Sequence, residues 1–407
     1  MRWGLLSFGA CSFLGACSFH LPGGSVGGGS DGGSDASGGS DMMTPDLPPP
    51  VDGCTSFSTQ FDTCAVQFSE AVTIGANKLY NTDTHVLSDF PSGANGVVLD
   101  GTQQIDVTGK AGTINVWLVT TMNLNGGQTL RVVGTKPFGI VASDKITIDG
   151  LLDGRSSSVL RGAGSLDAGA CGTATPAAPP AHVGGAAGGG GGAFQGAGGH
   201  GGDSDSNEGG SQGANGGVSQ PSPSGPRGGC PGSRGGNTGG SQTGGPAGDG
   251  GGAIYLVSQT FVEIHAAGQL NAGGAGGQGG RNIDGGGGAG GSGGMIILEG
   301  PMVKVDGTLA ANGGAGGGGA GGNTAGGPGG DGLPSAVAAV GGSSASNATP
   351  GVQGSAGGNL DGASNTAARL SAAGGGGGGG AGYISIVSGN QSLNGSTITP
   401  ALTTLPP

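Results

Sequence analysis

Carboxylates and histidines are the side chains of this 407-residue chain that could act as acids, bases or metal ligands. Four carboxylates in strand-like regions lie beside a glycine or within a few residues of one: Asp100, Asp106, Asp149 and Asp153. A pair of them could bind calcium, as lyase chemistry needs, but Asp next to Gly is more typical of turns or exposed strand positions. His85 and His265 are isolated in the sequence, which favours solvated or packing roles. We therefore predict no catalytic site, no metal site and no cofactor.

Three short motifs resemble known sites. Asn81-Thr82-Asp83 and Gly199-His200-Gly201 resemble polygalacturonase motifs, but the Asp-Asp pair and the downstream Arg-Ile-Lys of that family are missing. His200 also lies in a glycine tract, with no strand to hold a general base in place. Residues 326–334 fit the RTX nonapeptide, which binds Ca²⁺ between adjacent turns, so an isolated copy cannot complete a site. A carbohydrate-active β-helix enzyme, lyase or hydrolase, stays an alternative to a non-enzymatic role.

The composition excludes several classes of protein. The chain has 107 Gly, only 13 Lys and Arg, and a net charge of −12. Nucleic-acid binding needs clustered basic residues, so we expect no nucleic-acid partner. A strict Gly-X-Y period is missing, which excludes collagen.

A repeated strand pattern predicts the fold. Residues 251–274 and 293–317 each begin with Gly-Gly and continue with three short alternating segments, and residues 139–154 and 382–389 give an earlier and a partial later copy. A unit of about 20 residues cannot bury its own apolar face and needs a neighbour stacked on it. The sequence therefore predicts an all-β fold: a short parallel β-helix, or solenoid, over residues 54–407.

Side chains at equivalent positions of the copies are expected to stack on one another as columns inside the solenoid. The expected columns are Ile254, Ile296 and Ile384; Val262 and Val303; and Leu270 and Leu309, with Leu152 at the third position of the earlier copy. The next residues on the first strands, Tyr255, Ile297 and Ser385, are expected to face outward. Asp149-Gly150 and Asp306-Gly307 are expected to be turns with positive φ. Trp117 alternates with apolar neighbours and is expected to be a packing residue.

Long glycine-rich insertions follow the third strand of a unit, at about 155–252, 273–294 and 312–382. Ala272, Ala275, Gln278 and Arg281 recur every three residues, the repeat of a polyproline II helix. Ordering glycine is costly in backbone entropy, so both packed threefold helices and mobile loops remain open.

Four cysteines besides those near the start allow three disulfide connectivities. The sequence favours pairs between close neighbours, Cys54 with Cys64 and Cys171 with Cys230. Metal binding is a poor alternative, because there is no CxxC and no histidine is paired with a cysteine.

The first residues, with Arg2 before a short apolar run that ends in Leu14-Gly15-Ala16-Cys17, resemble a bacterial lipoprotein signal. The resemblance implies that residues 1–16 are a signal peptide and that Cys17 is the lipid attachment site, with the membrane as a partner through this anchor. An ordinary secretory signal is the alternative. Residues 17–53 are expected to form a disordered, flexible Gly/Ser/Asp/Pro tether. In this family the absence of Asp after the cysteine implies an outer-membrane lipoprotein of the cell envelope.

The chain resembles glycine-rich bacterial surface lipoproteins of the PE-PGRS-like kind, although the helical PE domain is missing. The resemblance rests on the lipoprotein signal at residues 14–17 (the lipobox), the tether, the paired cysteines and tracts such as "GGAGGGGAGG". This resemblance implies surface exposure and no established catalytic residues. We therefore expect a structural, adhesive or binding role, with cell-surface glycans or proteins as partners. A mostly disordered surface coat protein is a further alternative.

Overall fold

The computed structural model describes residues 54–99, 103–204, 210–239, 243–281, 283–366 and 372–406. Its strands are β1 (Val72–Ile74), β2 (Lys78–Asn81), β3 (Val86–Asp89), β4 (Val97–Val98), β5 (Gln104–Gly109), β6 (Gly112–Val119), β7 (Met122–Leu124), β8 (Thr129–Val133), β9 (Phe138–Ala142), β10 (Lys145–Ile148), β11 (Leu151–Asp153), β12 (Ala253–Ser258), β13 (Phe261–Ile264), β14 (Gln269–Asn271), β15 (Met295–Glu299), β16 (Met302–Val305), β17 (Thr308–Ala310), β18 (Tyr383–Val387), β19 (Asn390–Ser392) and β20 (Thr397–Thr399). Helix in this part of the chain is confined to α1 (Ala168–Cys171) and the 3-10 turns η1 (Thr63–Ala65) and η2 (Gly172–Ala174). The all-β class is confirmed.

Three sheets run through the molecule. Sheet A has the order β18-β15-β12-β9-β6-β5, sheet B the order β1-β7-β10-β13-β16-β19, and sheet C the order β20-β17-β14-β11-β8-β2-β3-β4. Each group of three consecutive strands from β6 onward gives one parallel strand to each sheet. The group β6 to β8 was not recognised as a copy from the sequence.

The predicted columns are in register. Ile254 pairs with Ile296, which pairs with Ile384, and Val262 pairs with Val303. Leu270 pairs with both Leu152 and Leu309. These side chains belong to one buried cluster between the sheets, so the alternating pattern predicted the core face correctly.

The other face of sheet A differs from the expectation. Tyr255, Ile297 and Ser385 lie on the face opposite the core, but they are only 0%, 0% and 2% exposed. Tyr255 and Ile297 belong to a second buried cluster, here called the outer cluster, against which four side chains of the amino-terminal segment pack: Phe57, Phe61, Val66 and Phe68. The prediction that these positions face solvent is wrong, and for Tyr255 and Ile297 the reason is that residues 57–68 pack against their cluster.

Antiparallel strands flank the parallel stack at its amino-terminal end. β5 pairs antiparallel with β6, and β3 pairs antiparallel with β2 and β4. At the other end, the amide of Thr403 donates to the carbonyl of Ile384, so the last residues lie along β18.

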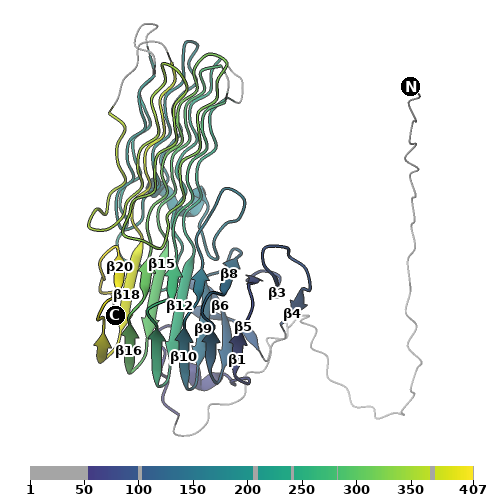
Figure 1. Ribbon diagram of the computed structural model, residues 1–407. Coiled ribbons are helices and arrows are strands. Elements are labelled where there is room, and N and C mark those ends of the chain that lie inside the picture. Colours follow the sequence, from purple (N-terminus) through teal and green to yellow (C-terminus); the bar gives the residue numbers. More distant parts are fainter. Residues whose placement is uncertain are drawn as a thin grey trace, which may run out of the picture. The chain divides into compact units, whose positions relative to one another are not determined.

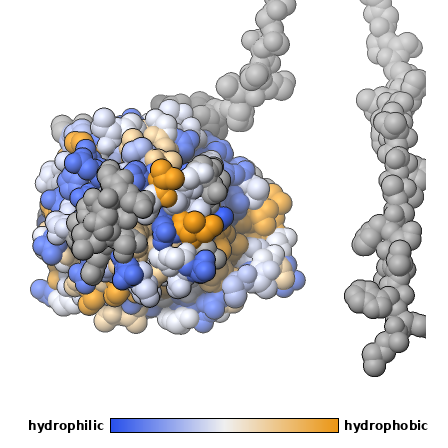
Figure 2. All heavy atoms as spheres, turned by 90° about the horizontal axis from the view of Figure 1, so that it is seen from above, coloured by the Kyte–Doolittle hydropathy of each residue, from blue (hydrophilic) through white to orange (hydrophobic). Residues whose placement is uncertain are grey.

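The glycine tracts leave sheet C and return to sheet A, as predicted. They connect β11 to β12, β14 to β15, and β17 to β18. In Figure 1 their segments run side by side beyond the ends of the labelled strands. We call this part the glycine bundle. Viewed from above, its far end shows apolar residues in small groups among polar ones (Figure 2).

Backbone hydrogen bonds between segments of the glycine bundle follow a period of three. The amides of Gly287, Gly290 and Gly293 donate to Gly374, Gly377 and Gly380, and those of Gly288, Gly291 and Gly294 donate to Gln278, Ala275 and Ala272. Ala289 and Ser292 donate to Ser233 and Cys230. This period is that of a polyproline II-type helix, which has no internal hydrogen bonds. Packed threefold segments, one of the two alternatives left open, are therefore what the structure contains.

Segment 285–294 is fully surrounded. It donates to segments 372–382, 272–281 and 228–236, and it accepts from segments 186–194, 244–252 and 311–321. A Cβ at Gly290 would lie 2.0 Å from the carbonyl oxygen of Gly314, so the close approach of these backbones requires glycine. Buried amides and carbonyls are costly unless they are paired, and this arrangement pairs them without a sheet.

The two Asp-Gly turns need glycine for a different reason from the one expected. Neither Gly150 nor Gly307 has a positive φ. A Cβ at Gly150 would instead lie 2.4 Å from the carbonyl oxygen of Gln128, and one at Gly307 would lie 2.1 Å from that of Gly268. Close stacking of successive turns excludes a side chain at these positions.

Candidate functional site

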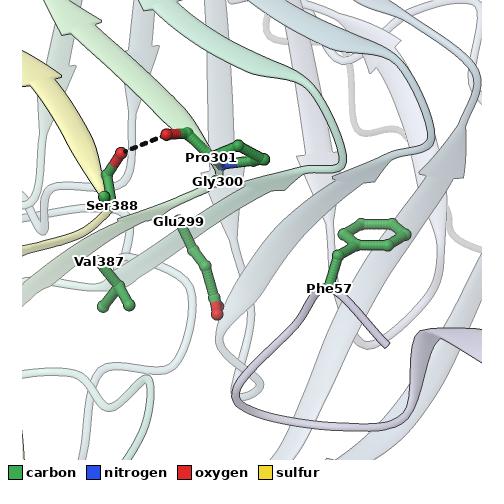
Figure 3. A pocket seen from close by; sticks show the side chains of 7 residues that line it. Phe57, Glu299, Gly300, Pro301, Val387 and Ser388 are labelled. Carbon is green, nitrogen blue, oxygen red and sulfur yellow. Dashed lines mark hydrogen bonds between the residues drawn. The ribbon is translucent and has the colours of Figure 1, made fainter. Parts of the chain in front are cut away.

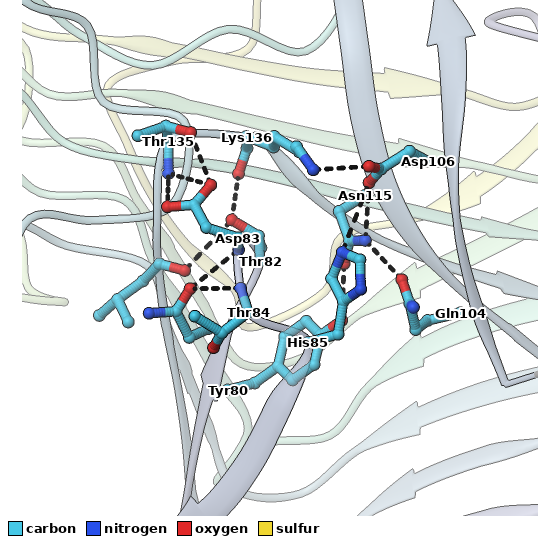
Figure 4. A network of polar contacts seen from close by, with 12 residues as sticks. Tyr80, Thr82, Asp83, Thr84, His85, Gln104, Asp106, Asn115, Thr135 and Lys136 are labelled. Carbon is cyan, nitrogen blue, oxygen red and sulfur yellow. Dashed lines mark hydrogen bonds and ion pairs between the residues drawn. The ribbon is translucent and has the colours of Figure 1, made fainter. Parts of the chain in front are cut away.

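The structure brings several polar residues together at the amino-terminal end of the stack (Figure 4). Asp83 follows β2, and its carboxylate accepts hydrogen bonds from the amide and hydroxyl of Thr135 at 2.9 and 2.6 Å. The hydroxyl of Thr82 donates to the carbonyl of Lys136 at 3.0 Å. These bonds tie the β2–β3 turn to the segment that follows β8.

Asp106 lies on the β5 side of the same network. Its carboxylate is 2.5 Å from Nζ of Lys136 and accepts from Nδ2 of Asn115 at 2.9 Å. His85, which has a φ of 58°, places Nε2 3.9 Å from this carboxylate. These three side chains come from three separate segments, so the sequence alone did not group His85 with Asp106.

The network continues into the core. The hydroxyl of Tyr80 donates to Oδ1 of Asn115 at 2.8 Å, and burial raises the pKa of Tyr80 to about 12. Trp117 and Phe138 pack against the Tyr80 ring, with centroids 4.9 and 5.5 Å away. Trp117 is thus a packing residue, as predicted, and Tyr80 stays protonated and acts as a donor.

The bonds of this network join separate segments of the chain. Asp83 is bonded to Thr135, and Asp106 is bonded to both Lys136 and Asn115. The network therefore holds three segments together.

A second charged cluster lies on sheet B, where equivalent positions of successive turns stack. His265 contacts Asp149 through Nδ1 and lies 3.1 Å from Glu263 through Nε2. Lys304 lies 3.0 Å from Glu263 and 2.9 Å from Asp306. Hydrogen bonding to Glu263, followed by the contact with Asp149, raises the pKa of His265. The sequence suggested that His265 is isolated. In the structure it instead bridges two repeats.

Two of the remaining candidates, Asp153 and Asp331, lie close enough to interact electrostatically. Asp153 is buried beside Arg131, 3.1 Å from its Nη1. Asp331, in the nonapeptide 326–334, accepts from the amide of Gly276 at 2.9 Å, and burial raises the pKa of its carboxyl. His200 is exposed on the glycine bundle. Asp100 and Cys17 lie outside the described residues.

A buried carboxylate that the sequence analysis missed lies where the amino-terminal segment covers sheet A. Glu299 is 4% exposed and accepts from the Tyr255 hydroxyl, from the Thr59 amide at 2.7 Å and from the Thr59 hydroxyl at 3.2 Å. Burial raises the pKa of Glu299 despite these bonds. The only sequence signal was a single Glu at the end of an apolar strand.

Beside Glu299 the surface is hollowed. The hollow of about 380 Å³ is lined by Phe57, Glu299, Gly300, Pro301, Val387, Ser388 and Gly389. Figure 3 shows the side chain of Glu299 between Val387 and the segment that carries Phe57. Because Glu299 is bonded to Tyr255 and Thr59, its role in this arrangement is to anchor residues 58–59 on the sheet.

Both favoured disulfides are present in the structure. Cys54 is joined to Cys64 and Cys171 to Cys230, each with a Cα–Cα distance of 5.8 Å. The first closes the segment that covers sheet A. The second joins the α1 region to segment 228–236 of the glycine bundle.

Among the described residues, no group of three or more His, Cys, Asp or Glu side chains could hold a metal ion, and no helix is long and apolar enough to cross a bilayer. Comparison of the chain with protein-family models, with curated proteins and with solved structures gives no match.

Proposed function

We propose that this protein is a bacterial envelope lipoprotein that serves as a rigid structural, adhesive or binding element at the cell surface. Cys17 would carry the lipid, and residues 17–53 would link it to the folded part. The observation that carries the proposal is the hydrogen-bonded glycine bundle, which is a second ordered part joined to sheets C and A.

We also propose that the strands form a β-helical solenoid with glycine-rich insertions. The proposal is supported by the contribution of one strand to each sheet by every repeat, with parallel pairing between repeats. In such an architecture the insertions on one side of the stack often form the interaction surface. A packed bundle presents its outer residues in fixed positions, which favours binding by a preformed surface.

The polar clusters support a non-enzymatic role. Asp83, Asp106 and Glu299 each accept bonds from neighbouring side chains or amides that link separate segments. Their bonding serves to hold the amino-terminal segments in place. A carbohydrate-active enzyme would need a carboxylate free to face a sugar.

The membrane part of the proposal is tested by Cys17→Ala in the full-length protein, expressed in a bacterial host. Detergent partitioning and metabolic labelling with a fatty acid should show a lipidated wild type in the membrane fraction and an unlabelled variant outside it. Equal membrane association and labelling of the two proteins would refute the lipoprotein assignment.

The binding part needs a separate experiment on residues 54–407. An array of cell-surface glycans, run beside turnover assays on acidic polysaccharides, should give binding without product release. Product release would favour the carbohydrate-active alternative. Absence of a cooperative melt in the same preparation would favour a disordered coat protein.

A further inference from the structure

A half-buried arginine in the first glycine-rich insertion lacks a counter-charge. The guanidinium of Arg227 lies over the ring of Phe194, 5.8 Å from its centroid. One of its Nη atoms donates to the carbonyl of Ala170 at 3.5 Å. Among the described residues, no carboxylate forms an ion pair with Arg227. Because a guanidinium carries several N–H donors, some of them remain for a further acceptor.

Two other arginines show how this chain compensates a guanidinium that is withdrawn from water. Arg131 and Arg155 lie 3.1 and 3.3 Å from the carboxylate of Asp153. At Arg227, burial lowers the pKa without any opposing carboxylate, and the Phe194 ring offsets only part of the cost. A bound anion would supply the missing counter-charge.

Arg227 also lines a hollow of about 400 Å³. The other described residues of its lining are uncharged: Ala111, Leu166, Ala170, Pro223 and Ser224. They come from the turn between β5 and β6, from the region of α1, and from the segment that leads to Arg227. The volume lies near the lower end of the range for small-molecule pockets, ~300–1,000 Å³, so a compact ligand fits best.

Covalent and hydrogen bonds fix the walls of this hollow. The wall formed by α1 ends at Cys171, which is joined to Cys230, and Arg227 lies shortly before Cys230 in the chain. The hydroxyl of Ser224 donates to the carbonyl of Lys110 at 3.4 Å, which ties a third segment to the other two. A site with walls held in this way needs little ordering when a ligand binds.

The charges beside the hollow favour an anion. Lys110, next to Ala111, is exposed and adds a second positive charge. Asp167, next to Leu166, is the negative group of the surrounding segments, and its carboxylate accepts from the amide of Ala170 at 2.9 Å as the cap of α1. Two positive groups therefore stand against one negative group, on a chain whose net charge is −12.

We propose that this hollow binds an acidic saccharide, with the sugar carboxylate held by Arg227. The planar fork of a guanidinium matches a carboxylate, and the short apolar walls suit the C–H groups of a sugar ring. The choice of a saccharide rests on the binding role at the cell surface proposed above, whereas the choice of an anion rests on Arg227.

Ligand-observed NMR titrations of the full-length wild-type protein test the ligand class. D-glucuronate should bind with a Kd of about 1 mM, because a single partly exposed charge pair carries most of the affinity. Neutral D-glucose and acetate, which lack the carboxylate and the ring respectively, should each bind about tenfold more weakly. Affinity for glucose or for acetate equal to that for glucuronate would overturn the proposal.

Variants test the role of Arg227. Arg227→Gln should weaken glucuronate binding about tenfold, and Arg227→Lys, which keeps the charge but loses the fork, should fall between Arg227→Gln and wild type. Arg281→Gln removes an exposed charge elsewhere in the glycine bundle and should leave the affinity unchanged. Matching thermal melts would show that the variants are folded. An equal loss in Arg227→Gln and Arg281→Gln, or no loss in Arg227→Gln, would overturn the assignment.

A glycan array separates failure of this site from failure of the binding role. Loss of acidic glycans alone in Arg227→Gln supports the site. Glycans bound equally by wild type and Arg227→Gln would overturn the site and leave the binding role intact. Absence of any bound glycan on the wild-type array would refute the glycan-binding role together with the site.

Discussion

Replacing Gly290 by alanine tests whether the glycine bundle is packed as described. The new Cβ would lie 2.0 Å from the carbonyl oxygen of Gly314 and 2.4 Å from its carbon. Both are backbone atoms, so no flexible side chain can move aside, and the two segments must separate. Gly358 is the matched control, because a Cβ there meets nothing within 4 Å and its φ is not positive.

The expected loss follows from two opposing effects. Overpacking of a close-packed interior costs ~1–3 kcal/mol, and a rigid backbone contact belongs at the upper end. Alanine also restricts the unfolded chain, which returns ~0.4–1 kcal/mol. Gly290→Ala should therefore lower the free energy of unfolding by about 2 kcal/mol, whereas Gly358→Ala should be neutral or slightly stabilising.

Thermal melts and hydrogen exchange of residues 54–407 measure the difference. For a unit of roughly 350 residues the unfolding entropy is ~0.7 kcal/mol/K, so the midpoint should fall by about 3 °C. Amides of segments 285–294 and 311–321 should exchange faster in Gly290→Ala than in Gly358→Ala. Equal midpoints and equal exchange in the two variants would show that the tract does not pack as a bundle.

Three further predictions concern the sheets and their links. Ile296→Asp and Ile297→Asp should each cost several kcal/mol, because both side chains are 0% exposed; a much smaller loss for Ile297→Asp in chemical denaturation would show that the outer cluster is not packed. Cys171→Ser opens a disulfide of sequence separation 59, and loop entropy predicts a loss of about 4 kcal/mol, checked by denaturant titration with and without reductant. Contacts with Glu263 and Asp149 raise the pKa of His265 above its ordinary 6.5, so its contribution to stability should be full below pH 6.5 and lost as the pH rises through the raised pKa; melts of wild type and His265→Gln across pH 5–9 should converge at the alkaline end.

The sequence predicted the parts of the fold that depend on local pattern. Alternation in residues 251–274 and 293–317 placed Ile254 over Ile296 and located the glycine tracts between the third and first strands. The copy formed by β6 to β8 was missed, since only a few residues separate it from β9 and no glycine tract marks its end.

The burial of Ile297 could not be read from its own repeat. Alternation along a strand shows that the side chains of two neighbouring residues point to opposite faces of the sheet, but it does not show what packs against each face. Here the cover comes from residues 57–68, far away in the sequence, and Glu299 holds that segment through Thr59. The contact of His85 with Asp106 also joins separate segments, so residues that are isolated in the sequence belong to one polar network in the fold.

The order of the glycine bundle depends more on the sheets to which it is attached than on its own composition. Ordering a residue costs ~1–2 kcal/mol of backbone entropy, and glycine loses the most, so an isolated tract gains too little to fold. Each tract of this chain starts at a strand of sheet C and ends at a strand of sheet A, and the stacked strands fix both ends. Because the sheets already hold the two ends of each tract together, they offset the entropy cost of loop closure, and each added segment forms hydrogen bonds with segments that are already ordered.

Side chains are tolerated where every third position faces out, as at Val337, Val340 and Ser343. The position of a residue within the threefold repeat, and not the number of glycines, therefore decides whether a substitution breaks the bundle or alters only its surface.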